Sequence, residues 1–124
     1  MPAPSDRRYA QTHEWHKLQG DTVTLGISKF AVDELTDITY LEVTAKGRVK
    51  AGDALGEVES VKATSEIYTG VGGEIVAVNQ EVVKDPSILN RDPYEKGWIV
   101  KIKVDDPKPL ESLMAAEEYE KAHS

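Results

Sequence analysis

Hydrophobic and polar residues alternate with a period of two in several short stretches of the chain. In Thr22–Ile27 every second residue from Val23 onward is apolar, the pattern of a strand with one buried face. The preceding Gln19-Gly20-Asp21 has the composition of a turn. Residues 13–18 are therefore expected to supply the partner strand of a hairpin, with Trp15 on its buried side.

Three further strands are predicted over residues 38–43, 75–78 and 98–104. In the last of these, Trp98, Val100, Ile102 and Val104 are expected to point inward and Ile99 outward. Six glycines between positions 47 and 73 divide the middle of the chain into short segments. Many short strands with this punctuation indicate an all-β sandwich or barrel.

Helical spacing is confined to two places. Ser28 can cap a short helix that ends near Leu35, with Phe30, Ala31 and Leu35 on its apolar face. After Pro109, apolar residues recur at helical intervals through Tyr119, which predicts one C-terminal helix packed on the sheets. Between the last two strands, Asp85-Pro86 and Asp92-Pro93 indicate a loop.

Composition narrows the functional classes. The chain has 124 residues and a formal net charge of -7; a nucleic-acid binder normally presents a clustered basic face instead. It has no cysteine, so redox chemistry requires a cofactor. No apolar run is long enough to cross a bilayer, and residues 1–8 show neither a signal nor a transit peptide. We expect one domain over residues 1–124, in the cytoplasm, or in the mitochondrial matrix for a eukaryotic source.

The sequence gives little support for a catalytic site or a metal site. The histidines at 13, 16 and 123 lack metal-ligand spacing. His13, Ser60 and Glu14 could form a nucleophilic triad only on paper, because no nucleophile-elbow sequence surrounds any serine. The glycines at 70, 72 and 73 lack the lysine of a phosphate loop and are read as a tight turn.

The segment from Glu57 to Ile67 has a different character. It reads as two strands that meet at a turn near Lys62, with Val58 and Ile67 pointing inward. A lysine at a hairpin tip is suited to carry a swinging group, because the sheet fixes its base while the side chain gives reach. The pattern alone is also compatible with a solvated, unmodified lysine.

Residues 58–65, with the sequence VESVKATS, resemble the lipoylation segment of glycine cleavage H proteins. Three further blocks extend this resemblance over nearly the whole chain. They are Tyr9 with Thr12-His13-Glu14-Trp15, Gly26-Ile27, and Leu89-Asn90 with Asp92-Pro93-Tyr94 and Gly97-Trp98. A biotinyl domain usually has methionine on both sides of its lysine, whereas Lys62 lies between Val61 and Ala63.

The resemblance implies an all-β hybrid barrel-sandwich with short flanking helices and a C-terminal helix. It implies lipoate on Lys62, with Glu59 and Gly73 recognised by the lipoate-attaching enzymes. The expected partners are the pyridoxal-phosphate glycine decarboxylase (P protein), the aminomethyltransferase (T protein) and the dihydrolipoyl dehydrogenase (L protein). We expect a non-catalytic monomer that carries the aminomethyl group and electrons between these enzymes.

The family shelters its loaded arm in a surface cleft. The corresponding positions are Thr12, Glu14 and Glu66, whose oxygens could accept hydrogen bonds from an ammonium group. The chain departs from the family pattern at three places: Thr36 stands where a glycine is common, Val43-Thr44-Ala45 lacks a proline often seen near that strand end, and Glu66 stands where aspartate is usual. A different backbone conformation is therefore expected in the turn at Thr36.

Two alternatives stay open on sequence grounds. An H-like carrier could serve lipoate relay or sulfur metabolism, and a structural β domain could leave its lysine unmodified. Reconstitution with the decarboxylase separates the first alternative from glycine cleavage, and exposure to a competent lipoate ligase tests the second.

Overall fold

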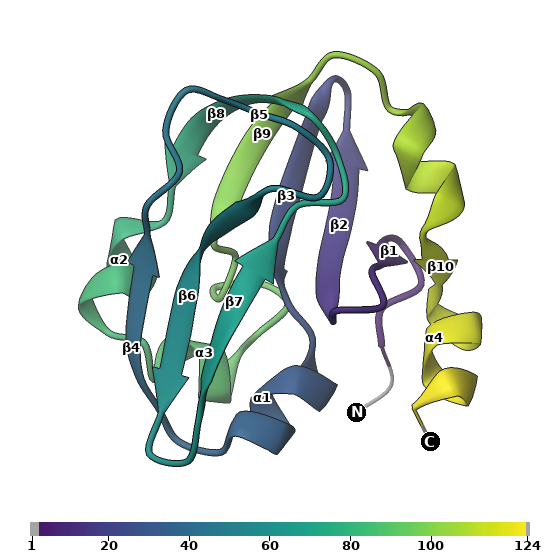
Figure 1. The fold of residues 1–124 in the computed structure, drawn as a ribbon. Coiled ribbons are helices and arrows are strands. Elements are labelled where there is room, and N and C mark those ends of the chain that lie inside the picture. Colours follow the sequence, from purple (N-terminus) through teal and green to yellow (C-terminus); the bar gives the residue numbers. More distant parts are fainter. Residues whose placement is uncertain (1–2, 124) are drawn as a thin grey trace.

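The computed structural model describes residues 3–123, whose strands form two antiparallel sheets (Figure 1). The seven-stranded sheet has the order β10-β1-β2-β3-β9-β8-β5, and the three-stranded sheet has the order β4-β6-β7. The strands are β1 (Arg8–Tyr9), β2 (Glu14–Gln19), β3 (Thr22–Ile27), β4 (Ile38–Val43), β5 (Arg48–Val49), β6 (Ala54–Ser60), β7 (Thr64–Tyr68), β8 (Gly73–Val78), β9 (Val100–Val104) and β10 (Met114–Ala115). The mostly-β class expected from the sequence is confirmed.

The hairpin of β2 and β3 forms as the alternating pattern predicts. Trp15 pairs with Gly26 across the two strands, and its indole crosses the glycine so closely that a Cβ on Gly26 would lie 2.7 Å from the ring. The indole nitrogen donates a hydrogen bond to the Pro93 carbonyl oxygen at 3.0 Å. Trp15 therefore ties this hairpin to the segment that precedes β9.

The two sheets share one apolar core. Leu25 from β3, Ile102 from β9 and Leu55 from β6 are fully buried in it. Val58 and Ile67 are each 1% exposed, which confirms that both point inward. Ile99, by contrast, is buried although the alternation placed it outward. The strand β9 begins only at Val100, so Ile99 belongs to the preceding irregular segment and does not follow the strand alternation.

Within residues 3–123, four α-helices flank the sheets: α1 (Lys29–Leu35), α2 (Gln80–Lys84), α3 (Ile88–Arg91) and α4 (Ala116–Ala122). In α1 the Ser28 hydroxyl accepts a hydrogen bond from the Ala31 amide, as expected of an N-cap. Its fully buried residue is Val32, which was not on the predicted apolar face. The predicted loop over residues 79–97 contains the short helices α2 and α3. No helix among residues 3–123 has the length and apolar character to cross a membrane.

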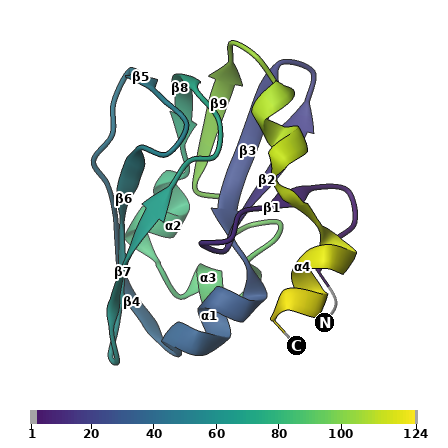
Figure 2. The ribbon, with the colours of Figure 1, turned by 45° about the vertical axis from the view of Figure 1, so that its right-hand side comes forward.

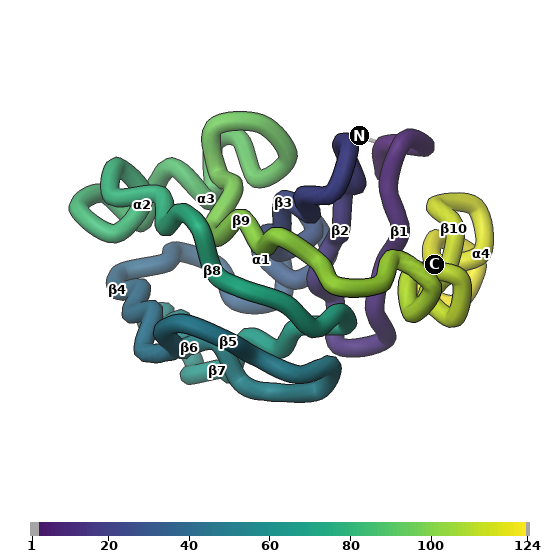
Figure 3. Tube along the Cα trace, turned by 90° about the horizontal axis from the view of Figure 1, so that it is seen from above, coloured from purple at the N-terminus to yellow at the C-terminus, as the bar shows by residue number. Residues whose placement is uncertain are grey.

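The predicted C-terminal helix is confirmed as α4, but it begins at Ala116 and not directly after Pro109. The 3-10 turn η1 (Lys108–Ser112) comes first, and Met114–Ala115 then forms β10 against β1 before α4 begins. Pairing with β1 satisfies backbone groups at the edge of the sheet, and this outweighs the helical spacing of the side chains. Tyr119 of α4 stacks on Tyr9 of β1 at 4.8 Å between ring centroids. Figure 3 shows this C-terminal segment beside β1, away from the three-stranded sheet.

Candidate functional site

Lys62 lies in the turn that joins β6 to β7, at the end of the three-stranded sheet. The Ser60 hydroxyl shapes this turn, because it accepts hydrogen bonds from the backbone amides of Lys62 at 3.1 Å and Ala63 at 3.0 Å. The Ser60 amide closes the turn onto the Ala63 carbonyl oxygen at 2.8 Å. The lysine side chain is thus presented from a turn of defined geometry.

Two contacts join this turn to the segment around the end of α1. The Lys62 ammonium donates a hydrogen bond to the Glu34 carbonyl oxygen at 3.3 Å. The Val61 amide, although its side chain is 75% exposed, donates to the Asp37 carbonyl oxygen at 3.3 Å. The lysine therefore rests against the carboxyl end of α1 rather than extending freely into solvent.

A small pocket lies between α1, β7 and the residues that begin β2. Its volume is about 130 Å³. Its apolar lining comes from Ile27, Ala31, Leu35, Val58 and Ile67. The polar lining brings together the three predicted cleft residues Thr12, Glu14 and Glu66, along with His13, Glu34 and Ser65. The Glu34 carbonyl oxygen also accepts the hydrogen bond from the Lys62 ammonium, so the pocket lies next to the candidate lysine.

Glu14 is the buried carboxylate of this pocket, with 1% of its surface exposed. It accepts hydrogen bonds from the Thr12 hydroxyl and, at 2.9 Å, from the Tyr68 amide. Burial raises the pKa of the Glu14 carboxyl, and these hydrogen bonds oppose the rise. A cation that entered the pocket would relieve the cost of burying this charge.

Glu66 lies on the exposed edge strand β7, where it accepts a hydrogen bond from the Tyr68 hydroxyl at 2.7 Å. The carboxylates of Glu14 and Glu66 keep lone pairs for further donors. A pocket lined by aliphatic side chains and carboxylates can hold the end of an alkyl chain that bears a cationic or hydrogen-bond-donating group.

The other two predicted residues lie in different places. Glu59 is in β6, three residues before Lys62, and pairs with Tyr40 and Thr64 on the neighbouring strands. Gly73 begins β8, at the opposite end of the molecule from the β6–β7 turn (Figure 1). A Cβ on Gly73 would lie 2.1 Å from the Lys103 carbonyl oxygen. Gly73 therefore has a packing role at the β8–β9 pair, whatever its part in recognition.

The three-stranded sheet is acidic beside Lys62. Glu57 is paired with Glu42 on one side and with Glu66 on the other, so three carboxylates form a row across the strands. Like charges directly opposite each other are unfavourable in an isolated sheet. This face is complementary to a basic protein surface.

The side chains of the hypothetical triad have other partners. The Ser60 hydroxyl is engaged in the lysine turn, and His13 Nδ1 is 2.7 Å from the Tyr119 hydroxyl. Glu14 bonds to Thr12 and Tyr68. These hydrogen bonds direct the three side chains to different partners.

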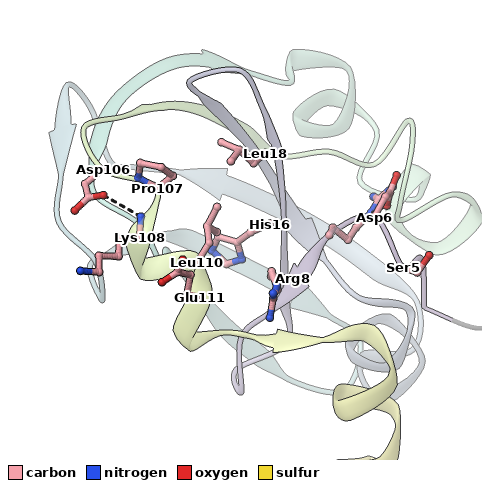
Figure 4. Close-up of a pocket in the computed structure, with 11 residues that line it drawn as sticks. Ser5, Asp6, Arg8, His16, Leu18, Asp106, Pro107, Lys108, Leu110 and Glu111 are labelled. Atoms are coloured by element: carbon pink, nitrogen blue, oxygen red, sulfur yellow. Dashed lines mark hydrogen bonds and ion pairs between the residues drawn. The ribbon is translucent and has the colours of Figure 1, made fainter.

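A second pocket, of about 490 Å³, lies between β1, β2 and the segment 106–111 (Figure 4). Cations and carboxylates alternate along it. Figure 4 shows the Lys108 amide bonded to the Asp106 carboxylate, and His16 lying near Leu110 and Arg8. His16 Nε2 accepts a hydrogen bond from the Gly70 amide at 2.9 Å, and burial lowers the pKa of His16 to about 4. None of the predicted site residues lines this pocket, and its mixed charge favours no single ligand.

Some contributors to the lysine site were not anticipated from the sequence. The Glu34 carbonyl oxygen could not be inferred, because a main-chain acceptor leaves no signal in residue type. The role of Ser60 in the turn could have been predicted, because a serine two residues before a turn lysine is a signal for a hydroxyl-stabilised turn.

Comparison with known proteins gives one consistent family. Residues 7–124 match the family model described as glycine cleavage H-protein. The glycine cleavage system H protein of Methylacidiphilum infernorum is 48% identical over 121 residues, covering 97% of this chain and 94% of that protein. The H protein of Staphylococcus saprophyticus is 43% identical over 120 residues, covering 96% and 95%. A crystal structure of the Mycobacterium marinum H protein superposes with a TM-score of 0.88 at 35% identity, covering 97% of this chain and 98% of that one.

Proposed function

Because this chain belongs to the glycine cleavage H-protein family, and is the non-catalytic lipoyl carrier of the glycine cleavage system, we propose that Lys62 bears its lipoyl group. As a component of that system, its partners are the P, T and L proteins. The observation that carries the assignment is the Lys62 turn itself, which is exposed, shaped by Ser60 and next to a pocket of suitable lining.

The sequence provides an internal comparison for this choice. The tripeptide Val-Lys-Ala occurs twice, at residues 49–51 and 61–63. Lys50 also lies near a turn, where its amide bonds to the Asp53 carboxylate at 2.8 Å. Only Lys62 of the two has its ammonium group directed to a residue that lines the aliphatic pocket.

The lining of the pocket suits the end of the group that the family carries. A lipoyl group, when bound, supplies a dithiolane that takes up the aminomethyl unit of glycine and is later reoxidised. The aliphatic residues Ile27, Leu35 and Val58 can pack on its alkyl chain. Thr12, Glu14 and Glu66 can accept hydrogen bonds from an amine at its end, and the burial of Glu14 strengthens such a contact. Excluding water from this end would slow hydrolytic loss.

Enzymes that attach lipoate must approach the β6–β7 turn. Glu59 and the acidic row of Glu42, Glu57 and Glu66 lie on the same sheet as this turn. We infer that these enzymes present a basic surface to that sheet, with Glu59 near their active site. Steering by opposite charge would favour fast, weak association, as suits a carrier that visits several partners.

The direct test is intact-mass spectrometry after incubation with lipoate ligase, lipoate and ATP. Wild-type protein and Lys50→Arg should both gain one lipoyl mass, and Lys62→Arg should gain none. A lipoyl mass on Lys62→Arg would place the attachment elsewhere. Absence of any mass gain in the wild type, with a known carrier modified in parallel, would count against lipoylation of this chain.

A further inference from the structure

The side chain of Asn90, on α3, bridges the turn between α1 and β4. Its Nδ2 donates a hydrogen bond to the Thr36 carbonyl oxygen at 2.8 Å. Its Oδ1 accepts a hydrogen bond from the Ile38 amide at 3.0 Å. Both ends of the carboxamide are therefore used on the same turn, although Asn90 lies 54 residues from Thr36 along the chain.

This turn needs outside support. Thr36 has φ 66° and ψ -139°, a conformation that residues with a Cβ rarely adopt. Such backbone persists where the surrounding structure holds it in place. On the helix side, the Thr36 amide donates the last hydrogen bond of α1 to the Val32 carbonyl oxygen at 2.9 Å. On the strand side, the two Asn90 hydrogen bonds fix the backbone that follows the strained residue.

The same segment supports the turn that carries Lys62. Asp37, between the two backbone groups that Asn90 binds, accepts the hydrogen bond from the Val61 amide. Glu34, two residues before Thr36, accepts the Lys62 ammonium. Figures 1 and 2 both show α1, α3 and the closed end of the β6–β7 hairpin together at one end of the molecule.

We propose that Asn90 is a positioning residue for Lys62: it fixes the strained Thr36–Ile38 turn, on which the Val61–Lys62 backbone and side chain rest. This inference rests on the proposed function of Lys62. An enzyme that acylates the lysine needs its amine at a defined place, because small displacements of a reacting group lower rates strongly. Losing the bridge should therefore slow modification of Lys62 without removing the lysine or the acidic sheet.

The test compares Asn90→Ala with Asn79→Ala in the full chain. Asn79 is a matched control, because its carboxamide also bonds to backbone groups on both sides without contacting the turn at residues 36–38. Its Nδ2 donates to the carbonyl oxygens of Lys96 at 2.9 Å and Trp98 at 2.8 Å, and its Oδ1 accepts from the Glu81 amide at 3.2 Å. Asn90→Asp is a second variant. It keeps the acceptor for the Ile38 amide and loses the donor to Thr36, so it retains one hydrogen bond if the alanine variant fails to fold.

Two readouts are measured for each protein: kcat/KM of lipoate ligase with the carrier varied, and hydrogen exchange of the Val61 amide relative to that of Val58. Asn90→Ala and Asn90→Asp should lower kcat/KM about tenfold and accelerate exchange at Val61 but not at Val58. Asn79→Ala should leave both unchanged at a temperature where it is folded.

Equal effects of Asn90→Ala and Asn79→Ala on ligation, or unchanged exchange at Val61 in folded Asn90 variants, would overturn the proposal. The exchange measurement keeps this outcome separate from a failure of the Lys62 assignment. If the wild type is modified at another residue, the proposed function fails, while Val61 exchange still reports whether Asn90 holds the turn.

Discussion

The Lys62 ammonium and the Glu34 carbonyl oxygen are 3.3 Å apart, and this hydrogen bond sets the lysine against the pocket that Thr12, Glu14 and Glu66 line. The nitrogen would remain a donor after acylation, because an amide N–H replaces the ammonium. The same contact can therefore direct a lipoyl arm along the end of α1 and toward the pocket.

Glu14→Gln is predicted to shorten the lifetime of the loaded carrier. Glutamine can still accept the Tyr68 amide and donate to Thr12, but it removes the buried charge that would hold an amine. Loss of a charge-assisted hydrogen bond corresponds to roughly tenfold faster release. The measurement is ammonia release from lipoylated carrier, loaded by the P protein and then separated from it.

Glu57→Gln is the matched control for this experiment, because Glu57 lies on the three-stranded sheet and does not line the pocket. It should release ammonia at the wild-type rate. Because burial raises the pKa of Glu14, its charge costs stability as the pH rises through that pKa. Glu14→Gln should thus unfold no earlier than the wild type at neutral pH. Equal release from both variants would contradict a sheltering role for Glu14.

His16 is predicted to make the fold acid-sensitive. Burial lowers its pKa from 6.5 to about 4, so the unfolded state binds a proton more readily than the folded state between these values. Stability from this group is present above pH 6.5 and is lost as the pH falls toward 4, on the order of 3 kcal/mol in all. His16→Gln keeps an acceptor for Gly70 and should lack this part of the pH dependence.

Urea unfolding at a series of pH values between 7 and 4 measures the effect as the difference between the two proteins. Parallel pH profiles for the wild type and His16→Gln would show that His16 does not titrate as its burial requires.

Thr36→Gly is predicted to stabilise the protein by about 1 kcal/mol, because glycine adopts a positive φ without the steric cost that threonine bears. Guanidinium unfolding measures the change. Thr24→Gly, in the extended backbone of β3, should have the opposite sign. A Thr36→Gly protein less stable than the wild type would show that the threonine side chain contributes more than its backbone conformation costs.

Gly73→Ala is predicted to destabilise the fold by about 3 kcal/mol, because the new Cβ would collide with the Lys103 carbonyl oxygen in β9. Gly72→Ala should cost less, since its nearest atom, the Val49 carbonyl oxygen, would be 3.2 Å away. Denaturant unfolding gives both values. A Gly73→Ala protein of normal stability that resists lipoylation would instead favour direct recognition of this glycine.

Local patterns predicted the parts of the molecule that depend on neighbours in sequence. The β2–β3 hairpin follows from strict alternation, and the cap of α1 follows from Ser28. The turn at Lys62 follows from two flanking strands whose inward residues, Val58 and Ile67, are both buried. The different backbone conformation expected at Thr36 is wrong, because this threonine has a φ of 66°, in the region that favours the glycine common at this position.

Contacts between distant segments could not be predicted in the same way. Residues 110–119 have helical spacing, yet β1 draws Met114–Ala115 into the sheet, and the helix is interrupted. The support of the lysine turn by Asn90 and by the Glu34 carbonyl oxygen depends on tertiary packing that leaves no local pattern. Family resemblance alone predicts Thr12, Glu14 and Glu66, and the fold brings them to one pocket.

Glycine cleavage depends on the group that we propose Lys62 carries. The most direct measurement is the exchange of bicarbonate into the carboxyl group of glycine, with the P protein and carriers treated with lipoate ligase. Wild-type and Lys50→Arg carriers should support equal exchange, and Lys62→Arg should give only the rate seen without carrier. Exchange by Lys62→Arg at the wild-type rate would contradict the account, because another residue would then carry the group.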